Sequence, residues 1–412
     1  MTVLDRFLQY VSYPTMSDEA STSSPSTAKQ LALGKHLAEE LQGMGISNAH
    51  LVEFGYVYAF LPANVEGDIP SVGFIAHMDT SDSAPDQPIC AKVVEYKGED
   101  ICLQEQKQYF LRAEDYPVLE HCRGQHLVVT DGTPLLGADD KAGIAEIMTA
   151  VETILTRKLP HGDIAIAFTP DEEIGRGVEH FRLEKFPASY AYTLDGGQLG
   201  ELEYENFNAA SAEVTVRGLS IHPGSAKGKM KNASLIACEF HQMLPPEEIP
   251  AKTEGYEGFF HLVGMEGEIE TAKLNYIIRD HDKENFQARK ELFRKIAQDL
   301  NQTYGEGTVT VTLRDSYYNM REKLEGHMEI LARARDAMQT LSIPPIEKPI
   351  RGGTDGAMLS FRGLPCPNLG TGGYNFHSRF EFASVEEMEQ ASELIVQLVI
   401  GLVEEVTGSR LN

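Results

Sequence analysis

Residues 163–169, with the sequence Asp-Ile-Ala-Ile-Ala-Phe-Thr, form an almost continuous apolar run. Such a run is typical of a strand that is buried on both faces, as occurs in parallel sheets covered by helices. Comparable runs lie at 57–61, 72–76 and 189–194, and stretches with apolar residues at helical spacing are distributed among them. This pattern predicts an α/β fold in which a mixed, largely parallel sheet is flanked by helices.

The character of the chain changes near residue 208. Residues 212–218 alternate with a period of two, as in an antiparallel strand that has one solvated face. Helical stretches at 233–244 and 283–300 and strand-like stretches at 259–263, 273–279 and 309–313 follow. We therefore predict a small α+β sandwich at 208–315, inserted into a catalytic domain that consists of 1–207 and 316–412.

Acidic and histidine side chains follow three of the predicted strands. They are His77 and Asp79, then Glu172 and Glu173, and finally Asp195. Ligand sites in α/β folds lie beyond the carboxyl ends of parallel strands, so these side chains are candidates for one site. Each group alone also has an ordinary explanation: a histidine at a strand end, acids that favour the first turn of a helix, and a turn residue before glycine.

A further pair of acids, Asp139 and Asp140, precedes a helical stretch at 141–155. Alone, the pair is well explained as an N-cap and a first-turn acid, and His377 as an ordinary loop histidine. Together, His77, Asp139, Glu173, Asp195 and His377 would give two metal ions one histidine and one terminal carboxylate each, with one shared carboxylate. Zn²⁺ accepts such ligands, and two metals about 3.5–4 Å apart can activate water and polarise a carbonyl.

Composition narrows the possible partners. The net charge of −26 over 412 residues opposes binding to nucleic acid. The five cysteines lack Cys-x-x-Cys spacing, which argues against a cysteine-based zinc site and fits reduced thiols. No apolar run approaches the ~20 residues that span a bilayer, and the first residues lack the features of a secretory signal. We expect a cytoplasmic protein that binds neither nucleic acid nor membrane.

The combined motifs resemble those of the M20 family of co-catalytic zinc peptidases and acylases. They are His77-x-Asp79, Gly137-Ala138-Asp139-Asp140-Lys141, Asp171-Glu172-Glu173, Asp195-Gly196 and the late His377. Further segments, at 135–148, 168–173, 205–211, 253–259, 315–322 and 349–356, are similar to the members of this family that cleave tripeptides. The resemblance therefore covers most of the chain. Motifs of other hydrolases, His-Glu-x-x-His and Gly-x-Ser-x-Gly, are absent from the sequence.

The resemblance implies an enzyme with two Zn²⁺ ions per subunit, bridged by Asp139. It assigns His77 and Asp195 to one ion, and Glu173 and His377 to the other. It also implies that Glu172 is the general base, that Asp79 orients His77, and that the Asp139–Asp140 peptide bond is cis. The expected reaction is removal of the N-terminal residue from unblocked tripeptides, with a water between the metals as nucleophile.

Candidate substrate-binding residues are less closely tied to motifs. His222 resembles a family histidine that points at the scissile carbonyl oxygen, where a donor stabilises developing charge, although a histidine before proline can also be a simple turn residue. Arg279, with Asn275 nearby, is the candidate for the peptide carboxylate, because guanidinium binds carboxylate bidentately. Arg351, Gly353 and Asn375 are further candidate contacts.

Other functions remain open at the level of sequence. Tripeptide preference comes from the resemblance alone, so dipeptidase, carboxypeptidase and N-acyl amino acid hydrolase specificities are alternatives. A metal-binding protein without catalysis is an alternative from another class, and it would need Glu172 or the ligands to be lost. The inserted domain can also form a homodimer, because an antiparallel sheet with exposed edges can pair across a two-fold axis.

Overall fold

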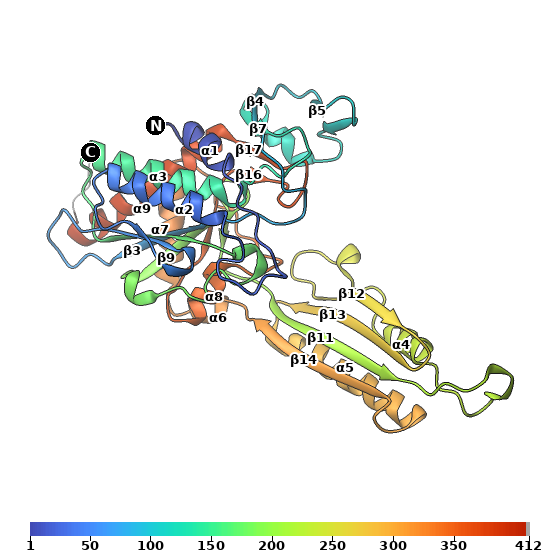
Figure 1. The fold of residues 1–412 in the computed structure, drawn as a ribbon. Helices are drawn as coiled ribbons and strands as arrows, with labels where there is room; N and C mark the ends of the chain where they lie inside the picture. Colours follow the sequence, from blue (N-terminus) through green and yellow to red (C-terminus); the bar gives the residue numbers. More distant parts are fainter. Residues whose placement is uncertain (409–412) are drawn as a thin grey trace. The chain divides into compact units, whose positions relative to one another are not determined.

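The chain divides into two units in a computed structural model that describes residues 1–408 (Figure 1). Unit 1 comprises Met1–Tyr204, Lys323–Lys348 and Thr354–Asn412, and unit 2 comprises Glu205–Glu322 and Pro349–Gly353. The predicted insertion at 208–315 lies within unit 2. Unit 2 also includes Pro349–Gly353, where Ile350 forms a bridge with Asn206.

The main sheet of unit 1 has seven strands. In spatial order they are β1 (His50–Leu51), β2 (Val57–Leu61), β8 (Ile164–Thr169), β3 (Val72–His77), β9 (Tyr190–Gly196), β15 (Asn368–Gly370) and β10 (Leu202–Glu203). The four strands β8, β3, β9 and β15 are parallel, and the outer strands pair antiparallel. Every residue of β3 and β8 is buried, as expected for central parallel strands. The predicted mixed, largely parallel sheet is confirmed.

Both faces of this sheet are covered. Alternate residues of β3 point to opposite sides, so that Phe74 belongs to one hydrophobic cluster and Ile75 to another. The first cluster includes α1 (Val3–Val11), α2 (Gln30–Gly43), α3 (Ala138–Arg157), α7 (Met328–Thr340) and α9 (Val385–Thr407). The second includes α8 (Asp355–Phe361) and the segment from Val178 to Phe186. The sheet is therefore the middle layer of unit 1.

A smaller antiparallel sheet holds the residues that precede the Asp139–Asp140 loop. Its strands are β16 (Gly373–Tyr374), β17 (Phe382–Ser384), β7 (His126–Val129) and β4 (Lys92–Glu95), and β5 (Ile101–Gln104) pairs separately with β6 (Tyr109–Leu111). Because β7 is outside the main sheet, Asp139 does not lie at or just beyond the end of a strand of that sheet, unlike His77, Glu172 and Asp195. Asp139 instead begins α3, which packs on β3 and β9.

Unit 2 is an antiparallel sheet covered by two helices (Figure 1). The strand order is β12 (Phe259–Gly267), β13 (Thr271–Asp280), β11 (Asn208–Arg217) and β14 (Val309–Tyr317), and the helices are α4 (Ala233–Gln242) and α5 (Lys283–Tyr304). Burial alternates along the second half of β11, as the period of two at 212–218 predicts. Asn232 and Asp282 cap the two helices through their side chains.

Short elements complete the chain. They are α6 (Arg321–Leu324) and the 3₁₀ helices Glu53–Gly55, Pro117–Cys122, Glu172–Ile174, Leu183–Lys185, Pro223–Ser225 and Pro250–Lys252. Within residues 1–408, no helix has both the length and the apolar character needed to cross a membrane.

Candidate metal centre

Three parallel strands bring the predicted ligands to one edge of the main sheet. Strand β3 lies between β8 and β9, and its last residue, His77, is in register with Thr169 at the end of β8. Glu172 and Glu173 lie in the turn just after β8, and Asp195 lies near the end of β9. The carboxyl ends of parallel strands point the same way, so these side chains share one edge of the sheet.

The side chain of Asp139 lies between the two histidines. Its Oδ1 is 2.7 Å from Nε2 of His77, and its Oδ2 is 3.3 Å from Nε2 of His377. Nε2 of His77 is also 3.5 Å from Oδ1 of Asp195, and Nε2 of His377 is 2.8 Å from Oε2 of Glu173. Each histidine thus faces Asp139 and one further carboxylate, an arrangement suited to two ions that share a ligand.

Glu172 belongs to the same cluster. Its carboxylate and the ligand atoms of His77 and Asp195 all lie within 4.8 Å of one another, as do those of His77, Asp139 and Glu173. The structure therefore brings together all five predicted ligands and the predicted general base. Their donors are imidazole nitrogen and carboxylate oxygen, which suit Zn²⁺ and other first-row divalent ions.

The electrostatics of the cluster fit cations as well. Burial, followed by the nearby charge of Asp195, raises the pKa of Glu172 well above its usual value, and burial raises the pKa of Asp195 to about 6. Hydrogen bonds to Asp139 and Glu173 raise the pKa of His377 to about 11. Carboxylates thus outnumber the imidazoles that can balance them, and bound divalent cations would replace the protons that this cluster otherwise holds.

Asp79 holds the pair Glu172-Glu173 in place. Its Oδ1 accepts a hydrogen bond from the backbone N–H of Glu172 at 3.0 Å, and its Oδ2 accepts one from that of Glu173 at 3.2 Å. Nδ1 of His77 is 3.1 Å from the carbonyl oxygen of Asp79 and 3.4 Å from its Oδ1. Asp79 is therefore placed to orient His77, as predicted, and it also fixes the backbone of the two glutamates.

Other acids support the residues around Glu172. The buried carboxylate of Asp171 accepts hydrogen bonds from the backbone N–H and the hydroxyl of Ser26, at 2.6 and 2.5 Å, and from the amide of Gln30 at 2.7 Å. The hydroxyl of Thr169, at the end of β8, donates to Asp355 at 2.7 Å. These contacts tie both ends of the turn after β8 to neighbouring elements.

The backbone is unusual at two places in the site. The peptide bond between Asp139 and Asp140 is cis, which confirms the expectation. Asn375 and His377 have positive φ angles of 55° and 58°, which non-glycine residues adopt rarely and mostly where surrounding contacts enforce them. The amide of Asn375 donates to the carbonyl of Phe380 at 3.0 Å, so this candidate substrate contact also shapes the loop that carries His377.

The candidate substrate residues of unit 2 are engaged within that unit. The guanidinium of Arg279 donates to the carbonyls of Ala210 and Ile278, at 3.3 and 3.0 Å, and Asn275 lies exposed four residues earlier on the same face of β13. His222 is exposed, and its Nδ1 accepts a hydrogen bond from the N–H of Gly224 at 3.2 Å. The Nε2 atom of His222 takes no part in that contact.

Arg351 and Gly353 take part in packing within unit 2. Arg351 donates to the carbonyls of Gly255, Glu257 and Thr253, at 2.7, 3.0 and 3.3 Å. A side chain at Gly353 would place its Cβ 2.7 Å from the ring of Tyr317. Both residues therefore have a structural explanation, and their contact with substrate stays a prediction.

Comparisons with known proteins agree with this geometry. Residues 204–308 match the model of a peptidase dimerisation domain. The chain is 56% identical to peptidase T of Clostridium perfringens and 54% identical to that of Halothermothrix orenii, in each case over 96% of this chain and 98% of the relative. Peptidase T of Bacillus subtilis is 50% identical over 96% of this chain and 97% of that protein.

The chain belongs to the peptidase T family of M20 metallopeptidases.

Solved structures show the same fold at low sequence identity. The crystal structure of aminopeptidase PepT from Bacillus cereus has a TM-score of 0.77 and 22% identity, and covers 97% of this chain and 98% of that one. A tripeptidase from Staphylococcus aureus has a TM-score of 0.76 and 18% identity, with 98% of both chains covered. Family membership rests on the sequence relatives. It confirms the predicted enzyme class, a metallo-aminopeptidase.

Two residues of this M20 chain that support the centre were not predicted. The carboxylate of Glu381 accepts hydrogen bonds from the backbone N–H groups of Leu136, Gly137 and Asp139, at 2.8, 2.9 and 3.2 Å. Asp140 accepts one from the N–H of His77 at 3.0 Å. Glu381 lies 242 residues from Asp139 and carries no motif, so only the fold reveals its role.

Proposed function

We propose that the chain is a dizinc aminopeptidase that removes the N-terminal residue from unblocked tripeptides. The observation that supports this proposal best is the position of Asp139, whose two oxygens face His77 and His377, each of which meets a further carboxylate. The proposed ligands are His77 and Asp195 for one ion, Glu173 and His377 for the other, and Asp139 for both. Peptidase T relatives at 50–56% identity support the choice of substrate.

When bound, the two ions supply Lewis acidity: they lower the pKa of a water and polarise the scissile carbonyl. The residues of the chain supply the proton transfers and the geometry. Glu172 takes the proton of the attacking water and returns it to the amine of the leaving peptide. Its carboxylate lies with His77 and Asp195 at the centre, where the surrounding protein favours proton uptake. Asp79 holds the main chain of Glu172 during this exchange.

We further propose that unit 2 provides substrate contacts and a dimer interface. His222 would donate to the carbonyl oxygen as negative charge develops there, and Arg279 with Asn275 would bind the free carboxylate of the peptide. The match to a dimerisation domain supports a homodimer through unit 2, whose outer strands β12 and β14 each have an unpaired edge within the described sheet. The expected cytoplasmic location stays a prediction.

The decisive experiment compares four substrates on the zinc-loaded enzyme: a free tripeptide, its N-acetylated form, the corresponding dipeptide and a longer peptide. We expect only the free tripeptide to be cleaved rapidly, with release of its N-terminal residue and loss of activity after chelation. Preference for the acetylated substrate or the dipeptide would instead indicate another M20 specificity. No turnover of any substrate would favour a binding protein.

A further inference from the structure

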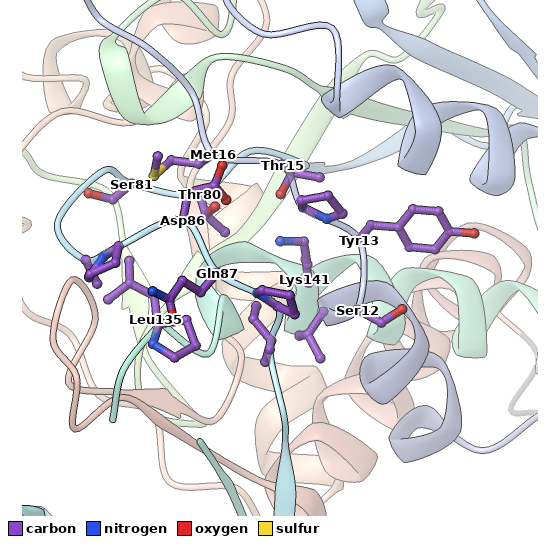
Figure 2. A pocket seen from close by; sticks show the side chains of 17 residues that line it. Ser12, Tyr13, Thr15, Met16, Thr80, Ser81, Asp86, Gln87, Leu135 and Lys141 are labelled. Carbon is purple, nitrogen blue, oxygen red and sulfur yellow. The ribbon is translucent and has the colours of Figure 1, made fainter. Parts of the chain in front are cut away.

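Unit 1 contains a cavity of about 230 Å³ beside α3 (Figure 2). Its walls are residues 11–16 at the end of α1, residues 80, 81 and 84–89 of the loop after β3, residues 134 and 135, and Lys141. One part of the wall is held in place, because Met16 forms a β-bridge with Thr80 and the hydroxyl of Thr27 donates to the carbonyl of Met16 at 2.8 Å. A cavity of this size can hold several waters or a small organic molecule.

Two buried hydrogen-bond donors face this cavity without acceptors. Lys141 and Thr15 both line it, and the side chain of Lys141 extends from α3 toward the segment that carries Thr15 (Figure 2). The side chain of Lys141 is 0% exposed and Thr15 is 1% exposed. Neither Nζ of Lys141 nor Oγ1 of Thr15 has a hydrogen-bond partner among residues 1–408. Burial of an amine without an acceptor is costly, so the pair indicates a ligand that supplies acceptor atoms.

The rest of the lining is mainly apolar. It includes Pro14, Pro85, Pro88, Ile89, Pro134 and Leu135. Asp86 is the one acidic residue among those that line the cavity, and its carboxylate already pairs with Lys29 at 2.5 Å. Ser12, Ser81 and Gln87 add neutral polar groups. The cavity therefore offers one buried donor pair beside a mainly apolar, otherwise uncharged or ion-paired wall.

We propose that this cavity binds a small carboxylate that carries a short aliphatic body. A carboxylate has two oxygens and about four lone pairs, so it can accept from Lys141 and Thr15 at the same time. The aliphatic part would lie against the prolines and Leu135. Free amino acids and simple branched organic acids share this chemistry.

This site is separate from the proposed metal centre, although the two share a segment of backbone. None of the five proposed metal ligands lines the cavity, and neither does Glu172. Thr80 follows Asp79 directly, and the N–H of Ser81 donates to Oε1 of Glu173 at 3.0 Å. The binding proposal stands on the cavity and its donors, and it does not depend on the proposed peptidase reaction.

The test is calorimetric titration of the metal-loaded full chain with isovalerate, its neutral analogue isovaleramide, and leucine. Isovalerate should bind, and isovaleramide should bind at least about tenfold more weakly because it lacks the charge. Thr15→Val removes one donor at nearly constant volume and should weaken isovalerate about tenfold. Ala84→Phe, in the exposed loop of the wall, should abolish binding by filling the cavity.

A matched control separates this cavity from other places where acids can bind. Thr156→Val removes an exposed hydroxyl on α3 that donates to the carbonyl of Glu152, and it should bind isovalerate as the wild type does. If leucine binds as well as isovalerate, the ligand class includes free amino acids; if it binds more weakly, the site takes simple acids.

Three results would overturn the proposal. The first is an absence of isovalerate binding at millimolar concentrations. The second is unchanged binding in both Thr15→Val and Ala84→Phe, which would place the acid elsewhere, for example at the metal centre. The third is binding of inorganic phosphate in place of isovalerate, which would assign the cavity to a tetrahedral anion. Lys141→Met, checked for folding by circular dichroism, should weaken isovalerate binding at least as much as Thr15→Val does.

Discussion

In unit 1, histidine and carboxylate side chains from β3, β9, α3 and the segments after β8 and β16 face one another at 2.7–3.5 Å. In unit 2, the candidate arginines donate instead to main-chain carbonyls of their own unit, and His222 lies exposed. The first arrangement has carboxylates in excess and fits a cation. The two arginines of unit 2 already donate to main-chain carbonyls of that unit, and they would have to exchange those hydrogen bonds to bind a peptide.

This difference separates two kinds of functional residue. Ligands of one metal ion must lie within a few ångströms of a common point. Their arrangement can therefore be recognised from unit 1 alone, which contains all five proposed ligands. Residues that bind a flexible substrate need only present a donor, and the same donor can meanwhile stabilise the fold. Substitutions at the metal centre of unit 1 should therefore change catalysis. Substitutions of Arg279 and Arg351 in unit 2 should show which arginine contributes to substrate binding and which to stability.

The largest effect is expected at Glu172. Glu172→Gln keeps the shape of the side chain and removes the base, so kcat for a free tripeptide should fall by about 10²–10⁴-fold while both metals remain bound. Metal content by mass spectrometry or atomic absorption checks the second point. Glu179→Gln, an exposed glutamate seven positions later, is the matched control and should keep full activity. Substantial turnover by Glu172→Gln would refute the assignment of the base.

A smaller loss is expected at Glu381, a positioning residue. Glu381→Ala removes the acceptor for three backbone N–H groups around Asp139, so kcat and zinc affinity should both fall by about 10–100-fold. Glu381→Gln keeps one acceptor oxygen and should recover part of both. Glu393→Gln, exposed on α9, is the control. If Glu381→Ala lowered thermal stability without changing zinc affinity, the residue would have a structural role only.

The sequence predicts the central strands and the residues at their ends well, because buried parallel strands are apolar throughout and end at defined polar positions. Strand β2 has the predicted bounds, Val57–Leu61, and β3 extends the predicted 72–76 by one residue, His77. It does not predict which sheet contains β7, since a run of three apolar residues, Leu127–Val129, fits either sheet. The sequence also does not predict the role of Glu381. Its partners are the backbone N–H groups of residues about 240 positions away, and Glu381 belongs to no recognisable sequence motif.

Unit 2 offers a direct comparison of two arginines. Arg279→Met should raise KM for a tripeptide by about tenfold with little change in kcat, because one charged contact to the substrate carboxylate is lost. Arg351→Met should leave KM unchanged and lower the free energy of unfolding by about 1–3 kcal/mol, because several hydrogen bonds from a charged group are removed. Reversed effects, with KM raised only by Arg351→Met, would assign the carboxylate contact to Arg351.

The smallest effect is expected for the ion pair between Lys290 and Asp315 in unit 2, with Nζ–Oδ1 at 2.8 Å. Burial acts to raise the pKa of Asp315, but hydrogen bonds from Lys290 and Tyr318 lower it overall. A depressed pKa in the folded state contributes stability above the unfolded value of about 3.9, and this contribution is lost as pH falls through the folded pKa. Asp315→Asn should therefore cost about 1 kcal/mol at neutral pH.

Chemical denaturation of the wild type and Asp315→Asn across the acidic range measures this difference. The two free energies of unfolding should converge as pH falls below the folded pKa of Asp315, whereas kcat at neutral pH should be the same in both proteins. Asp299→Asn, a partly exposed acid on α5, should show no comparable pH-dependent difference. A fall in kcat at neutral pH with unchanged stability would mean that charges of unit 2 act in catalysis as those of unit 1 do, and the contrast between the units would not hold.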